Sequence, residues 1–190
     1  MLGRRELMKQ AAATLALVLL LPDPPGFDQG PDVVRAFDEL RELRGEEMMA
    51  ENVVQRASIS SDAAARAVAA AVAEANKTSV PVTIVIVDES GSLKEMRRMD
   101  GAPLVSIQTA INKAYAAAAI GMATDDFYGA IESDSAAVAS FATRPGLALI
   151  AGGIPIQTNN AVAGAVGVAG ALTGAEDKRI AQEAARSALV

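Results

Sequence analysis

The sequence predicts an α/β fold of the α+β type, in which helices pack against an antiparallel sheet in the order α-β-β-α-α-β-β-α. Runs of β-branched and other apolar residues come in two adjacent pairs, and Ala-rich segments with apolar residues at helical spacing flank and separate these pairs. Consecutive strands joined by short turns pair with each other, which favours an antiparallel sheet over a doubly wound parallel one. Hydrophobic residues make up 51% of the 190 residues but aromatic ones only 3%, so Ala, Val, Ile and Leu must form the core.

The first 30 residues are typical of a twin-arginine export signal followed by a linker. Arg4 and Arg5 precede an apolar run over 11–21, and prolines follow that run. The pattern predicts an extracytoplasmic protein, either periplasmic or secreted. No clear small-x-small cleavage site follows, so an ordinary N-terminal helix stays the alternative. Residues 31–57 carry apolar residues at helical spacing among charged ones and are predicted to form an extra helical segment.

Residues 58–190 are predicted to form the main domain, beginning with a helix over 63–76. Ser60 or Ser61 can accept hydrogen bonds from the unpaired amides of the first turn, and Asp62 is favoured near the positive end of the helix. This helix is rich in Ala and Val. Another element is therefore expected to approach it closely.

A β-hairpin is predicted next. The β-branched run over 80–87 is typical of a strand buried on both faces, and residues 93–99 form the returning strand. Between them, residues 88–92 have the composition of a turn, with Gly91 able to adopt a positive φ.

The second half of the domain is predicted to contain a further strand pair between helices. Pro103 fits the first turn of a helix, and Thr124 is predicted to start another, which Pro145-Gly146 ends. The first of these helices is expected to bury the face formed by Ile107, Ile111, Ala114, Ala118 and Met122. The remaining predicted elements are a helix over 124–143, strands over 147–158 and 161–170 joined at Asn159-Asn160, and a closing helix over 174–189.

The composition excludes several classes of function. A net charge of −6 argues against a nucleic-acid partner, which requires clustered Lys and Arg. The chain contains no Cys and no His. Disulfides, iron–sulfur ligation, a Ser-His-Asp triad and the commonest haem and zinc ligands are thereby excluded. Any metal or acid–base chemistry must use oxygen, Lys or Met groups.

Several segments together resemble the GlcG/HbpS-like haem-binding family, which also occurs as the C-terminal domain of PduO-type proteins. The segments are Val85–Gly91, Arg98–Ala102, Ala110–Ala119 with Lys113, Gly152–Ile156 and Gly164–Ala171. They cover about 60–189 in the family's order. The resemblance implies a profilin-like fold and often a homo-oligomer. It also implies haem as a cofactor, and for exported members a link to iron or redox sensing with a possible sensor-protein partner.

Thr124 is the first candidate for a metal ligand. The resemblance implies that this threonine lies at the haem iron, and an oxygen ligand suits a chain without His. The alternative is that Thr124 is a helix N-cap, because Asp125 and Asp126 follow it and acidic residues are favoured at the positive end of a helix.

Arg98, Lys113 and Asp100 are the other candidate ligand-binding residues. In an acidic protein, Arg98 and Lys113 could receive the two carboxylates of haem. The alternative is that these cations are solvated or paired with acidic side chains.

Three functions are therefore open from sequence. The first is an exported protein that binds haem or a similar small ligand. The second is an enzyme acting on a small carboxylate metabolite, with Arg98 and Lys113 holding the carboxylate and Asp100 as base. The third is a structural oligomer without catalysis. Sequence alone identifies no catalytic residue.

Overall fold

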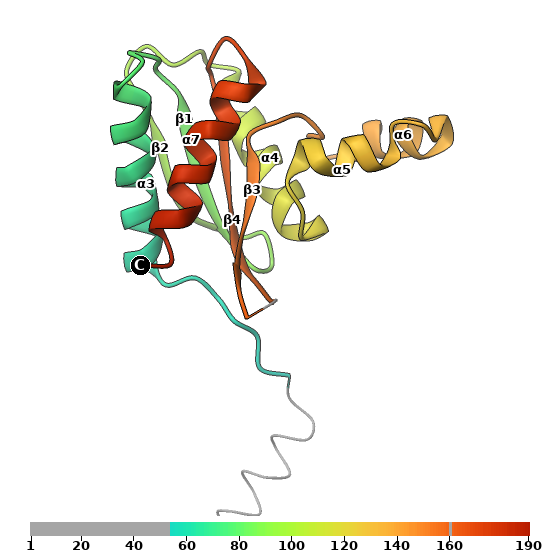
Figure 1. Cartoon of the computed structure of the whole chain (residues 1–190), viewed down its shortest axis with the longest axis horizontal. Coiled ribbons are helices and arrows are strands. Elements are labelled where there is room, and N and C mark those ends of the chain that lie inside the picture. The colour runs from blue at the N-terminus through green and yellow to red at the C-terminus, as the bar shows by residue number, and fades with distance from the viewer. Residues whose placement is uncertain (1–53, 160) are drawn as a thin grey trace, which may run out of the picture. The chain divides into compact units, whose positions relative to one another are not determined.

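A computed structural model describes residues 54–159 and 161–190. The twin-arginine segment and nearly all of the predicted helical segment 31–57 lie outside the described residues, so both stay predictions. The chain divides at residue 55/56, and the unit from Arg56 to Val190 contains all the described helices and strands. These elements, shown in Figure 1, are α3 (Ser61–Asn76), β1 (Thr83–Asp88), β2 (Leu93–Arg98), α4 (Ser106–Ile120), α5 (Thr124–Ile131), α6 (Ser135–Ala142), β3 (Gly153–Thr158), β4 (Ala161–Ala169) and α7 (Gly174–Ser187).

The four strands form one antiparallel sheet in the order β2-β1-β4-β3. Strand β1 lies inside the sheet and is almost entirely buried, as its β-branched sequence predicts. Both predicted hairpins, β1–β2 and β3–β4, are present. The predicted α+β class with an antiparallel sheet is confirmed.

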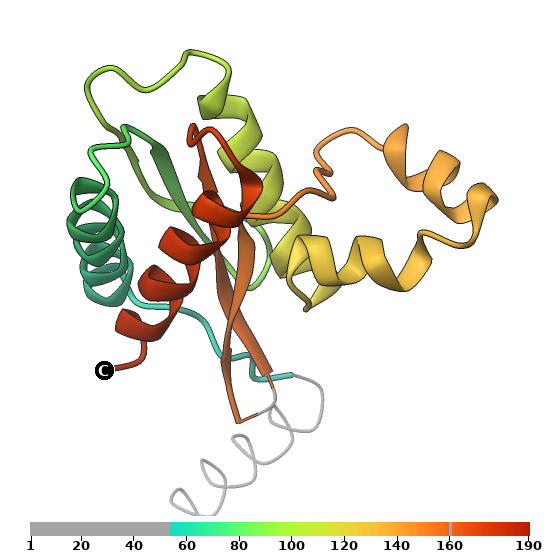
Figure 2. The ribbon, with the colours of Figure 1, turned by 45° about the horizontal axis from the view of Figure 1, so that its top comes forward.

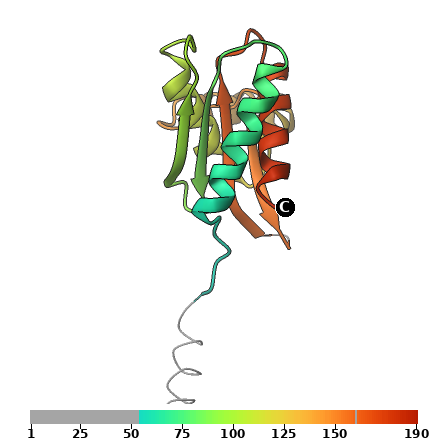
Figure 3. The same cartoon turned by 90° about the vertical axis from the view of Figure 1, so that its left-hand side faces the viewer.

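Helices cover the sheet on both faces (Figure 3). Helices α3 and α7 pack against each other and against one face, where Ile84, Val166 and Ile180 are fully buried. Helix α4 packs on the opposite face against β1, β3 and β4, where Val85 and Ala114 are fully buried. None of the described helices is long and apolar enough to cross a membrane.

The start of α3 matches its prediction closely. Ser60 is the N-cap, and its hydroxyl accepts a hydrogen bond from Ala63 N at 3.2 Å. Asp62 lies in the first turn. The side of α3 that faces the core is mostly Ala, which allows α3 to approach its neighbours closely.

Helix α4 differs from its prediction in both start and buried face. It begins at Ser106 rather than at Pro103, and Gly121 ends it with a φ of 75°, so that Met122 lies beyond the helix and is 43% exposed. Its buried residues include Ala110, Ala114 and Ala117, whereas Ile107 and Ile111 are only partly buried. Because Gly167 of β4 has no Cβ, α4 approaches the strand so closely that an added Cβ would lie 2.6 Å from Ala114 N, and the small alanine side chains of α4 suit this close approach.

The single helix predicted over 124–143 is divided into two. Asp134 caps α6 by accepting hydrogen bonds from Ala136 N at 3.0 Å and Ala137 N at 3.1 Å, so the chain restarts a helix after α5 has ended. Aspartate is favoured at such caps, and this local preference outweighs continuation of the helix. Figure 2 shows the α5–α6 hairpin extending away from the sheet.

Strand β3 is shorter than predicted. Residues 147–152 are not a strand, and β3 begins only at Gly153. Gly152 has a φ of 117°, which an L-amino acid rarely adopts and which turns the chain just before the strand.

Candidate functional site

Thr124 is fully buried at the junction of α5 and β3. Its hydroxyl donates to Ile150 O at 2.6 Å and accepts a hydrogen bond from Gly153 N at 3.1 Å. The N-cap of α5 is Ala123, which makes no side-chain cap bond, so the interpretation of Thr124 as an N-cap is wrong. The hydroxyl instead ties the chain before β3 to the first residue of that strand.

Thr124 also helps to protect the free edge of the sheet. The Gly153 N–H that points away from β4 is occupied by Thr124, and Pro155, two residues on, has no N–H. Further along, the Gln157 side chain donates to Gly121 O at 2.9 Å. An edge strand with few available donors resists the addition of another strand. Thr124 therefore has a structural role in the described conformation.

Lys113 is buried with an exposed fraction of 1%. Its ammonium group donates to Val168 O at 2.9 Å and to Asp177 Oδ2 at 2.7 Å, which joins α4 to β4 and α7. The other oxygen of Asp177 accepts a hydrogen bond from Ala171 N at 3.1 Å. Burial raises the pKa of the Asp177 carboxyl, while Lys113 acts in the opposite direction. Lys113 is therefore paired with an acid, which is the alternative that the sequence left open.

Arg98 and Asp100 lie at the other edge of the sheet. Arg98 ends β2, and its guanidinium donates to Ala102 O from Nε at 3.1 Å and from Nη2 at 2.5 Å, closing the loop after the strand. Asp100 is exposed within that loop. No hydrogen bond or ion pair among the described residues joins either of them to Lys113 or Thr124. The structure thus brings Lys113 and Thr124 close to Gly152-Gly153 but does not gather all four residues into one cluster.

An exposed surface beside α4 was not predicted. Val85 and Val87 face α4, and their partners across β2 are Met96 and Leu93. Directly opposed residues point to the same face of a sheet, but α4 covers β1, β3 and β4, and leaves β2 exposed. Leu93 is consequently 58% and Met96 43% exposed.

Tyr115 borders this exposed strand. Its ring packs so closely over Gly91, in the β1–β2 turn, that a Cβ placed there would lie 2.6 Å from Tyr115 Cδ2. Tyr115 is nevertheless 40% exposed. We call the surface formed by Leu93, Met96, Arg98 and Tyr115 the β2 shelf. It combines apolar contact area, a phenol, a thioether and a cation.

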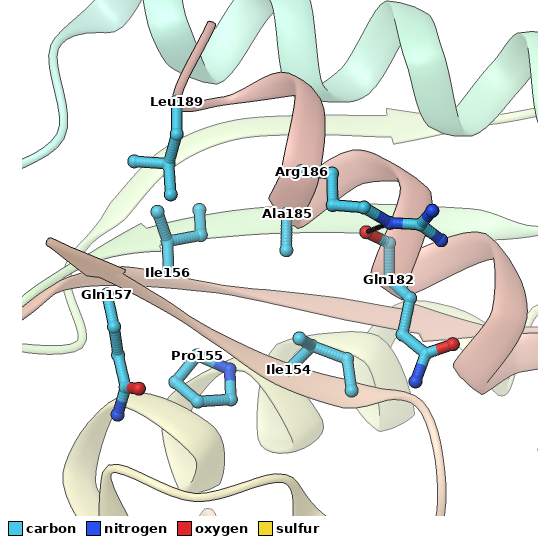
Figure 4. Close-up of a pocket in the computed structure, with 8 residues that line it drawn as sticks. All are labelled: Ile154, Pro155, Ile156, Gln157, Gln182, Ala185, Arg186 and Leu189. Atoms are coloured by element: carbon cyan, nitrogen blue, oxygen red, sulfur yellow. Dashed lines mark hydrogen bonds between the residues drawn. The ribbon is translucent and has the colours of Figure 1, made fainter.

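A groove lies between β3 and α7 (Figure 4). This groove of about 480 Å³ is lined mainly by apolar side chains, and its one charged residue, Arg186, donates from Nε to Gln182 O at 3.2 Å. None of the predicted site residues lines it. Within the described residues there is also no cluster of three or more acidic, His or Cys side chains that could hold a metal ion.

The acidic pair after Thr124 is used in a contact between helices. Lys178 of α7 donates to Asp125 Oδ2 at 2.7 Å and to Asp126 Oδ1 at 3.0 Å. These hydrogen bonds, that to Asp125 first, raise the pKa of Lys178. The pair therefore helps to hold the start of α5 against α7.

The structural role of Thr124 can be tested by replacing it with valine, which has the same shape but no hydroxyl. Thr124→Val leaves the buried Gly153 N–H without its partner, and we expect the free energy of unfolding to fall by about 2–3 kcal/mol. Urea unfolding followed by circular dichroism measures this change. Thr124→Ser keeps the hydroxyl and serves as the control. A loss of stability in the serine variant with none in the valine variant would show that the methyl group, and not the hydroxyl, matters.

Comparison with known proteins gives consistent results. A family model described as "Haem degrading protein HbpS-like" matches residues 59–186. An uncharacterised 15.0 kDa protein from the dhaT-dhaS intergenic region of Citrobacter freundii is 32% identical over 131 residues, which are 68% of this chain and 92% of that protein.

Two solved structures are also similar over the same domain. A double mutant of HbpS from Streptomyces reticuli is 30% identical with a TM-score of 0.66, covering 71% of this chain and 90% of that one. The PduOC–haem complex is 27% identical with a TM-score of 0.63, covering 68% of this chain and 94% of that one.

Proposed function

This chain belongs to the HbpS-like family, and on that premise we propose that it binds haem. The observation that carries the proposal is the similarity to PduOC, whose structure is a haem complex and whose length this chain covers almost completely. The proposal needs an iron ligand other than His or Cys, since the chain contains neither.

Thr124 does not fit this role in the described conformation. Its oxygen is inaccessible to solvent and already makes two hydrogen bonds, so it could reach an iron atom only by releasing Ile150 O. The resemblance that places Thr124 at the iron therefore stays a prediction that needs its own test.

The β2 shelf fits haem better. A porphyrin needs an exposed apolar surface, an axial ligand and a cation for its carboxylates. Leu93 and Met96 offer the surface, Arg98 at the end of the strand offers the cation, and Tyr115 offers a phenolic oxygen, a ligand type known for haem iron. Met96 is the alternative ligand. The bound iron would supply redox chemistry, and the residues of this chain would position it.

The test is a titration of the purified chain with haemin, followed by the Soret band. We expect saturable binding in the parent, and a changed spectrum with weaker binding in Tyr115→Phe. Met96→Leu and Thr124→Val should retain the parent spectrum. No saturable Soret change in the parent would exclude haem binding. If Thr124→Val folds and is the one variant that loses the parent Soret spectrum, Thr124 is the iron ligand. If Met96→Leu is the one variant that loses it, the Met96 thioether is the ligand.

We also propose that the protein is a homo-oligomer that uses helix α6. This helix has no charged residue and none of its residues is buried, although Val138 and Phe141 are large and apolar. Among the described elements it makes extended contacts only with α5. A second copy of the chain would cover this surface. Native mass spectrometry of the haemin-loaded protein reads both the subunit number and the number of haems per subunit, and a monomer would exclude this part of the proposal.

We further propose that the protein is exported from the cytoplasm and acts outside it. The twin-arginine pattern at Arg4-Arg5 supports export, and an exported haem protein suits haem-linked iron or redox sensing with a sensor partner. Cell fractionation tests export directly, because retention of the whole chain in the cytoplasm would exclude it.

A further inference from the structure

A second small-molecule site is suggested by a pocket at the end of the sheet. Strands β2 and β4 both run antiparallel to β1, so the helices that follow them, α4 and α7, begin at the same end of the sheet. Between these two helix starts lies a pocket of about 440 Å³. We call it the α4–α7 pocket. Its lining residues are Pro103, Val105, Ser106, Thr109, Lys113, Ile150, Ala169, Gly170, Ala171, Gly174 and Asp177.

The charges of the α4–α7 pocket favour an anion. Lys113 and Asp177 are its only charged lining residues, and they neutralise each other. The ammonium group has three N–H donors, of which two are used by Val168 O and Asp177; none of the described residues accepts the third. The positive end of the α4 dipole also faces the pocket with no acidic residue in its first turn, whereas Glu176 and Asp177 lie in the first turn of α7. The spare N–H donor of Lys113 and the start of α4 therefore favour a negatively charged oxygen at this end of the pocket.

The mouth of the same pocket is apolar. Val105 is 74% and Ile150 56% exposed, and Pro103 lies beside them. The volume is near the lower end of the range for small-molecule sites. A ligand that matches both the Lys113 end and the apolar mouth of the pocket has a compact negative group at one end and a short hydrocarbon chain at the other.

We propose that the α4–α7 pocket binds a short-chain aliphatic carboxylate, with its carboxylate towards Lys113 and its chain against Val105 and Ile150. This site does not depend on haem binding, because it shares only Lys113 with the residues that the sequence predicted and none with the β2 shelf. It also leaves out Arg98, which was predicted to hold a carboxylate together with Lys113, and Asp100, which was predicted to act as a base, because neither residue lines this pocket.

The test uses butyrate as the probe, with butyramide as a neutral analogue of the same shape. Isothermal titration calorimetry on the full chain should show saturable binding of butyrate and at least about tenfold weaker binding of butyramide, because the amide lacks the charge. Comparable affinity for the two compounds, or no saturable binding of butyrate, would overturn the proposal.

A charge placed at the mouth tests the location without disturbing the buried pair. Val105 is exposed and is the N-cap of α4 without a side-chain bond, so both Asp and Asn are tolerated there. Both variants remove the apolar contact of Val105 with the hydrocarbon chain, so Val105→Asn should weaken butyrate binding modestly, and Val105→Asp should weaken it about tenfold further through like-charge repulsion. Equal affinities in the two variants would place butyrate elsewhere and refute the assignment of this pocket.

Discussion

Gly167→Ala is expected to lower the free energy of unfolding by about 3 kcal/mol or more. Gly167 lies on β4 where α4 crosses it. A Cβ there would lie 2.6 Å from Ala114 N and would overlap the Ala110 carbonyl oxygen. Both are backbone atoms of α4, so relief requires the whole helix to move away from the sheet. Chemical denaturation followed by circular dichroism measures the loss.

The matched control is Gly129→Ala in α5. Nothing lies within 4 Å of the Cβ that this change would add, and Gly129 has no positive φ. Alanine has the higher helix propensity, so this substitution should stabilise the protein by about 0.5–1 kcal/mol. If Gly167→Ala were tolerated as well as Gly129→Ala, the close packing of α4 on β4 would be incorrect.

Local patterns were sufficient to predict the elements whose formation depends on nearby residues. Ser60 caps α3 through a residue three positions away, and the β1–β2 hairpin closes across a short turn. Such signals lie within a few residues of each other. The boundaries of α4 and β3 could not be predicted in the same way. The buried face of α4 is determined by Gly167, which is distant in sequence, and β3 starts where Thr124 binds Gly153.

The candidate site was predicted only in part for the same reason. Thr124 and Lys113 were identified as notable residues, but their partners are Ile150, Gly153 and Asp177, the last of them 64 positions from Lys113. A lysine that is paired and a lysine that is free look alike in a sequence. The β2 shelf was missed because exposure of Leu93 and Met96 follows from which strands α4 covers, and that requires the assembled fold.

Lys113→Met is expected to cost about 3–5 kcal/mol of the free energy of unfolding. The substitution leaves the Asp177 carboxylate buried without its cation and removes the donor to Val168 O. Lys113→Met/Asp177→Asn removes the charge as well, while the asparagine oxygen can still accept from Ala171 N. The double variant should therefore recover part of the loss. Urea denaturation of both variants and the parent measures this difference.

The pH dependence of the two variants separates a lost ion pair from a simple loss of packing. Burial already raises the pKa of the Asp177 carboxyl above its ordinary value, and removal of Lys113 raises it further. The folded state of Lys113→Met then binds a proton that the unfolded chain has released, so its stability falls as the pH rises from about 4 towards 7. Lys113→Met/Asp177→Asn lacks this carboxyl and should not show the additional slope. The two variants should thus be similar near pH 4 and diverge at neutral pH. A difference between them that does not change with pH would mean that Asp177 is not a buried charge stabilised by Lys113.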